Sequence, residues 1–113
     1  MDQRISLITL GVADLARARR FYEAGLGWKP VSALDAVCFY QLPGMVLGLF
    51  GRDALAEDAK HPIDGTFSGV TIAINGRDRA EVDAIFSEAL AAGAKALKPP
   101  EAVFWGGYSG YFA

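Results

Sequence analysis

The sequence contains one cysteine and one histidine, and this scarcity excludes several classes of protein. Cys38 has no partner for an internal disulfide, so the chain is not a disulfide-stapled secreted scaffold. A lone thiol instead fits a reducing compartment, and we expect a cytoplasmic protein. The single histidine, His61, stands beside Pro62 in a segment rich in charge and offers no cluster of imidazoles for a metal.

Long apolar runs and a strong excess of one charge are also missing. The first residues combine an acid, a base and a strand-like run, without the apolar stretch and cleavage site of a signal peptide. No segment has the length and hydrophobicity of a membrane span. The 11 Lys and Arg are scattered and give a net charge of −2 with the 13 Asp and Glu. We therefore expect no membrane and no nucleic-acid partner.

An internal repeat is the most informative feature that is present. Residues 6–12 read SLITLGV and residues 68–74 read SGVTIAI, with a constant spacing of 62 residues (68 − 6) between Ser6 and Ser68, Thr9 and Thr71, and Val12 and Ile74. Each run is β-branched and apolar at strand length and precedes a helical pattern. The repeat predicts two copies of one supersecondary unit, with any ligand site shared between them.

Periodicity and turn residues divide the chain into a single domain of two modules. In module one, residues 1–50, we expect a strand over 5–12, a helix over 15–24 capped by Asp14, and strands over 28–34, 37–42 and 45–50. Residues 51–67 lose all periodicity and are expected to form a linker. In module two, residues 68–113, a capping box over 78–81 starts a helix, and strands follow at 95–98 and 107–112.

These elements predict an α+β fold of two tandem βαβββ modules. The modules would form a curved mixed sheet with the helices outside it, and the second module would lack its last strand because the pattern stops at Ala113. One face of the first strands, with Ile8, Leu10, Val12, Val70, Ile72 and Ile74, is uniformly apolar and is expected to pack under the helices.

The opening of module one resembles a known family. LITLGVADLARARRFYEAGLGW (7–28) has Asp-Leu after a strand, Phe-Tyr on the helix and Leu-Gly after it, as in the glyoxalase / bleomycin-resistance / ring-cleaving dioxygenase superfamily, the vicinal oxygen chelate fold. FWGGYSGYFA (104–113) resembles the segment that leads into that family's last hairpin. The resemblance covers nearly the whole chain and implies paired βαβββ modules, frequently with homodimer formation.

The resemblance also implies a divalent metal, but the ligand positions do not match. The first-strand histidine, the fourth-strand glutamate and the fifth-strand histidine of the metal-binding members fall on Leu7, Gly48 and Gly69, and the last carboxylate would lie past Ala113. Leucine and glycine side chains cannot donate a lone pair to a cation. We therefore expect neither a metal nor another cofactor.

No other catalytic group stands out. Cys38 lies inside a predicted strand, where a buried apolar thiol is expected rather than a nucleophile. Glu23, Asp83 and Glu88 fall at positions of the helices that are expected to face solvent. The sequence is compatible both with an enzyme and with a protein that only binds a ligand.

Strand alternation does predict a concave, mostly apolar site. If Leu7 and Gly69 point inward, Thr9, Gly11, Thr71 and Ala73 share their face, and the neighbouring strands add Val46, Gly48, Phe50, Phe39 and Gln41. The aromatic rim of the second module would be Trp105, Tyr108 and Tyr111. We expect ligand contacts at Thr9, Phe39, Gln41, Gly48, Trp105 and Tyr108.

Three functions are compatible with this pattern. The first is a metal-free domain that binds a small, flat, partly apolar molecule, as the resemblance to drug-binding members implies. The second is a metal-dependent lyase or dioxygenase of the same superfamily, with ligands supplied elsewhere. The third is a chain that only folds and forms a homodimer.

Overall fold

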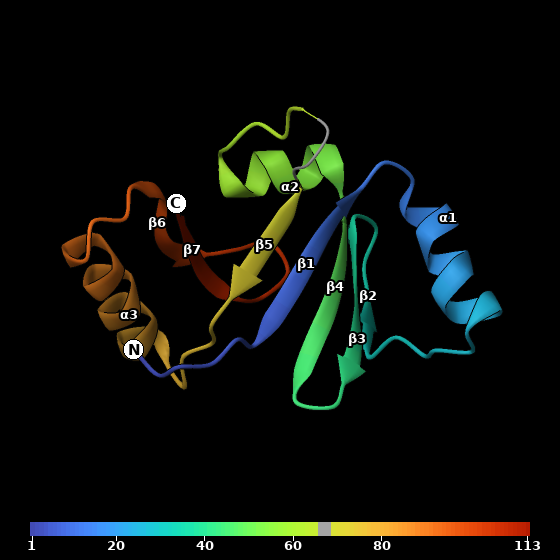
Figure 1. The fold of residues 1–113 in the computed structure, drawn as a ribbon, viewed down its shortest axis with the longest axis horizontal. Coiled ribbons are helices and arrows are strands. Elements are labelled where there is room, and N and C mark those ends of the chain that lie inside the picture. The colour runs from blue at the N-terminus through green and yellow to red at the C-terminus, as the bar shows by residue number, and fades with distance from the viewer. Residues whose placement is uncertain (66–68) are drawn as a thin grey trace.

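The computed structural model describes residues 1–65 and 69–113 and shows the expected α+β class (Figure 1). The elements in chain order are β1 (Leu7–Val12), α1 (Leu15–Arg20), η1 (Phe21–Gly25), β2 (Ser32–Ala33), β3 (Val37–Leu42), β4 (Met45–Gly51), α2 (Arg52–Ala59), β5 (Val70–Ala73), α3 (Arg79–Ala91), β6 (Ala96–Ala102) and β7 (Tyr108–Phe112). Ser68, the expected start of module two, and positions 66–67 of the expected linker lie outside the described residues. None of the described helices is both long and apolar enough to cross a bilayer.

Five strands form one mixed sheet in the order β2-β3-β4-β1-β5. β1 is parallel to β4 and antiparallel to β5, and β3 and β4 are joined by the expected turn at Pro43-Gly44. Gly44 has a φ of 78°, which glycine adopts without the clash that a Cβ would cause. The sheet is mixed, as expected, and β6 and β7 form a separate two-stranded hairpin beside it.

The first half of the chain has a well-formed core beneath its helix. Asp14 caps α1 by accepting a hydrogen bond from the Arg17 amide at 3.0 Å, as expected. The capped helix places its apolar side over the sheet, where Cys38, Tyr40 and Leu49 are fully buried. Leu10, Val12, Leu15, Ala18, Tyr22, Trp28 and Leu47 pack around these three residues. The helical segment turns into the π-helical η1 at Phe21, which completes the expected span of 15–24.

The second half differs from the first in its packing. Asp78 caps α3 by accepting from the Glu81 amide at 2.8 Å. α3 contacts β6 and β7, but the outer residues of β5 stay open, with Val70 53% and Ile72 66% exposed. The expectation that these two side chains pack under a helix is therefore wrong. The sequence pattern of β5 is that of a buried strand, but its packing partner is missing from the described residues.

The expectation of an irregular linker is wrong for 52–59, which form α2. Leu55 and Ala59, four positions apart, are buried on one side of this helix, and Leu55 packs with Val37 and Phe50. Lys60 ends the helix with a φ of 53°, the left-handed conformation of a C-terminal cap. α2 follows β4 directly in the sequence, and in Figure 1 it lies near the upper ends of β4, β1 and β5.

A buried ion pair connects α2 with the β6–β7 hairpin. Lys98 of β6 is 2% exposed, and its Nζ donates to Asp58 Oδ1 at 2.8 Å. The other carboxylate oxygen of Asp58 accepts from the Tyr111 hydroxyl at 2.9 Å. Burial raises the pKa of Tyr111, and the nearby Asp58 charge acts in the same direction. This cluster fixes the distance between the hairpin and the rest of the molecule at one side.

Candidate functional site

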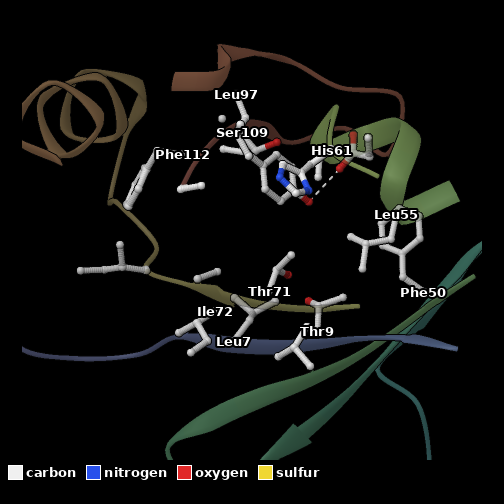
Figure 2. A pocket seen from close by; sticks show the side chains of 18 of the residues that line it. Leu7, Thr9, Phe50, Leu55, His61, Thr71, Ile72, Leu97, Ser109 and Phe112 are labelled. Carbon is white, nitrogen blue, oxygen red and sulfur yellow. Dashed lines mark hydrogen bonds between the residues drawn. The ribbon is translucent and has the colours of Figure 1, made fainter. Parts of the chain in front are cut away.

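A large cavity lies between the five-stranded sheet and the β6–β7 hairpin (Figure 2). Its volume is about 890 Å³. Figure 2 shows Leu7, Thr9 and Thr71 on one side of the space, with Leu97, Ser109 and His61 on the opposite side. Residues of α2 and α3 complete the wall. Residues of both halves of the chain therefore line one cavity, and the binding of a ligand in it stays a prediction.

Most of the wall is apolar. β5 and the residues next to it contribute the consecutive residues 69–76, and α3 contributes Val82, Ile85 and Phe86. Because consecutive rather than alternate residues of β5 and of β7 line the space, each strand presents its edge to the cavity. A cavity of this size and composition, with a few polar groups, is typical of sites for small molecules.

Four of the six predicted ligand contacts line this cavity: Thr9, Phe39, Trp105 and Tyr108. Thr9 is 8% exposed and Phe39 is half-buried, both on the face of the sheet that points into the cavity. Trp105 is 37% exposed, and its ring lies where a Cβ on Gly107 would be. The structure thus brings side chains from both halves to one space, and their contact with a ligand stays a prediction.

Gly48 and Gln41 do not line the cavity. Gly48 has the predicted orientation, but the space above it is filled: an added Cβ would lie 3.0 Å from Thr9 Oγ1 and 3.2 Å from Cε1 of Phe39. Gln41 is exposed, and its amide donates to the carbonyls of Leu42 at 2.8 Å and Met45 at 3.2 Å. These bonds hold the Gln41 side chain on the β3–β4 turn.

The residues present do not fit the metal that the fold family implies. Leu7 and Gly69 line the cavity without a donor atom in their side chains, and Gly48 is covered. Across residues 1–65 and 69–113, no three His, Cys, Asp or Glu side chains come close enough to hold an ion.

The polar groups of the wall are mostly bonded to neighbouring protein atoms. The Tyr108 hydroxyl donates to Asp83 Oδ1 at 2.8 Å, and this bond raises the pKa of Tyr108. Tyr111 donates to Asp58, and His61 Nδ1 lies 3.0 Å from the Pro62 carbonyl. Ser109 Oγ is buried and is the one such side-chain atom in the described part of the chain without a hydrogen-bond partner.

Sequence reasoning missed the contribution of α2 and the segment after it. Leu55, Asp58, Ala59, His61 and Ile63 all line the cavity. The signal for the helix is short, because it consists of Leu55 and Ala59 four positions apart among charged residues. The charged character of 51–67 concealed this periodicity.

The predicted solvent-facing carboxylates also have partners. Glu23 is bound by the Arg19 guanidinium through two hydrogen bonds, at 2.6 and 3.1 Å, and by the Tyr40 hydroxyl at 3.0 Å. The hydrogen bonds from Arg19 hold the pKa of Glu23 below its ordinary value. Glu88 accepts from the N-terminal amine. Cys38 is fully buried in the core, as expected, and does not line the cavity.

Comparison with known proteins gives one family. The profile of the Glyoxalase/Bleomycin resistance protein/Dioxygenase superfamily matches residues 4–113. No curated protein sequence matched the chain. Among solved structures, a glyoxalase-related enzyme from Fulvimarina pelagi is 36% identical, with 99% of this chain and 81% of that chain covered and a TM-score of 0.54.

Two further solved structures share the fold at lower identity. A glyoxalase/bleomycin resistance protein/dioxygenase from Nocardioides is 24% identical, with 100% of this chain and 77% of that chain covered and a TM-score of 0.51. A structure described as an NAD-dependent benzaldehyde dehydrogenase from Legionella pneumophila is 18% identical, with coverage of 95% and 87% and a TM-score of 0.74.

Proposed function

Because this chain belongs to the Glyoxalase/Bleomycin resistance protein/Dioxygenase superfamily, we propose that it binds a small, partly apolar molecule without a metal in the cavity between the sheet and the β6–β7 hairpin. The observation that carries the proposal is the cavity itself, whose volume of about 890 Å³ and apolar wall suit such a molecule. Phe39, Trp105 and Tyr108 would contact its apolar part, and Thr9 would set its orientation.

Trp105→Ala tests this assignment. An aromatic contact contributes about 0.5–1.5 kcal/mol beyond area burial, so the variant should bind a compound found by thermal-shift screening about two- to tenfold more weakly. Phe104→Ala is the matched control, since Phe104 is 72% exposed and does not line the cavity. Equal affinities of the wild type and Trp105→Ala would contradict the proposal.

The alternative function is a metal-dependent lyase or dioxygenase of the same superfamily. The observation that favours this alternative is that the 36% identical relative is described as a glyoxalase-related enzyme. The residues of this chain argue against a metal-dependent enzyme, because the side chains of Leu7, Gly48 and Gly69 cannot act as metal ligands. Metal analysis of protein purified without chelator separates the two functions, and a stoichiometric transition metal that survives gel filtration would favour the enzyme.

We also propose a homodimer in the cytoplasm. The exposed apolar side chains of Val70, Ile72, Phe104 and Phe112 lie in the second half, where β5 is the edge strand of its sheet, and such edges favour association. The single, buried thiol of Cys38 supports a reducing compartment. Light scattering at micromolar concentration tests the dimer, and a monodisperse monomer of 12.1 kDa would refute it.

A further inference from the structure

Three side chains with polar rings line the cavity, and each donates a hydrogen bond to another protein group. Tyr108 donates its hydroxyl proton to Asp83, and Tyr111 donates its proton to Asp58. The third ring, His61, has Nδ1 at 3.0 Å from the Pro62 carbonyl. A carbonyl only accepts hydrogen bonds, so Nδ1 carries the proton and Nε2 of the neutral ring is an acceptor. The two phenols, and the ring of His61 in its neutral form, therefore offer lone pairs and no further protons to a ligand.

The carboxylates that accept the tyrosine hydrogen bonds make the two phenol oxygens better hydrogen-bond acceptors. A phenol that donates to a charged acceptor makes a short, strong hydrogen bond, and its own oxygen becomes a better acceptor. Lys98 balances the charge of Asp58 and is buried behind it, with its Nζ 5.3 Å from the centre of the Tyr111 ring. The ion pair therefore holds Asp58 in place as the acceptor for Tyr111. The hydroxyls of Thr9, Thr71 and Ser109 and the side-chain amide of Asn75 can take either role and add no preference, whereas the indole N–H of the partly exposed Trp105 can only donate.

We propose that Tyr108, Tyr111 and His61 form an acceptor wall, which selects neutral, mostly apolar ligands that donate hydrogen bonds through a hydroxyl or amine group. A ligand with only acceptors would place its oxygen against the oxygens of the two phenols and leave them unsatisfied, which costs binding free energy. This inference rests on the proposed function, since it concerns the chemistry of the same cavity.

Three naphthalene compounds of nearly equal shape test the proposal. 1-Naphthol donates a hydrogen bond, 1-methoxynaphthalene only accepts one, and 1-naphthoate is an anion that only accepts. Each is titrated into the full chain, and binding is followed by the NMR shifts of the amides of cavity residues. We expect 1-naphthol to bind at least about fivefold more tightly than either of the other two.

Substitution of the tyrosines makes the test specific. Tyr108→Phe removes one acceptor. Tyr108 is half-exposed at the start of β7, so its substitution should not disturb the core. Tyr111→Phe removes the second and leaves the Lys98–Asp58 pair in place. Each variant should bring the ratio of 1-naphthol to 1-methoxynaphthalene affinity closer to one. A general loss of stability would weaken both probes and leave that ratio unchanged.

Tyr40→Phe provides the matched control. Tyr40 also donates to a carboxylate, that of Glu23, but it lies in the core of the first half and does not line the cavity. Its substitution should leave the ratio unchanged. Equal affinity of 1-naphthol and 1-methoxynaphthalene for the wild type would overturn the acceptor wall and leave the proposed function standing. Failure of all three probes to bind would overturn both.

Discussion

Thr9 and Thr71 lie directly opposite each other in the antiparallel pair of β1 and β5. The same two residues are equivalent in the sequence repeat, so the repeat and the strand register share a centre at this pair. An antiparallel arrangement of repeated strands places a local two-fold axis between the two threonines. Both side chains line the cavity, which explains how one site draws its walls from both halves.

Substitution of Gly48 should destabilise the fold. Gly48→Ala places a Cβ 3.0 Å from Thr9 Oγ1 and 3.2 Å from the Phe39 ring, and overpacking of this kind costs about 1–3 kcal/mol. Gly51→Ala, at the end of the same strand, has open space around the new Cβ and should change stability little. Urea unfolding of both variants decides this, and equal midpoints would show that Phe39 moves aside freely.

Disruption of the buried ion pair should be the most damaging single change. Asp58→Asn leaves the Lys98 ammonium buried without a counter-charge, and loss of one partner of such a pair costs about 3–5 kcal/mol. Asp2→Asn removes the carboxylate from an exposed pair with Arg4, and we expect a change below about 1 kcal/mol. The free energies of unfolding from denaturant titration measure both, and similar values would contradict the structural role of Lys98.

Low pH should lower the stability of the first half of the chain by protonating Glu23. Because Arg19 lowers the pKa of Glu23 in the folded state, its contribution is present above the ordinary carboxyl pKa and is lost as the pH falls below about 4.5. Glu23→Gln should therefore flatten the fall of melting temperature with acid, while Glu57→Gln, on the exposed side of α2, should not. An unchanged acid limb in Glu23→Gln would argue against the Arg19–Glu23–Tyr40 cluster.

As the pH rises, Tyr40 and Tyr111 should lose their hydroxyl protons later than an exposed tyrosine does. Burial raises the pKa of Tyr40 and of Tyr111, so the folded state holds these protons more tightly than the unfolded chain. The resulting stability is present below the ordinary tyrosine pKa of about 10 and is lost as the pH rises above it. The absorbance of phenolate should therefore rise in two stages, the second coinciding with loss of circular dichroism. A single stage for all four tyrosines, completed while the protein stays folded, would count against this packing.

The strongest sequence patterns predicted the first half well. The strand over 37–42 has the observed bounds, and Asp14 acts as a helix cap, because β-branched alternation and capping chemistry are local properties of the chain. The register of Thr9 and Phe39 toward the cavity also followed from alternation. Gln41 follows the same alternation but does not line the cavity, because its amide is bound to carbonyls of the adjacent turn.

The second half depended on contacts that no local pattern encodes. β6 was expected to stop at Lys98, before Pro99 and Pro100, but it continues to Ala102. Prolines are tolerated at the edge of a sheet, and β6 is one strand of a two-stranded hairpin. The burial of Lys98 requires Asp58, forty residues earlier in the chain, and the importance of α2 could not be inferred without that pairing.

The cavity lies where the second half lacks a core of its own. In the first half β4 brings Leu47 and Leu49 under α1, whereas β5 and the apolar side of α3 border open space. A molecule bound there would pack against the apolar residues of β5 and α3. Part of its binding free energy would then be used to order the protein around it. A ligand bound there would therefore raise the free energy of unfolding, by an amount that grows with its concentration.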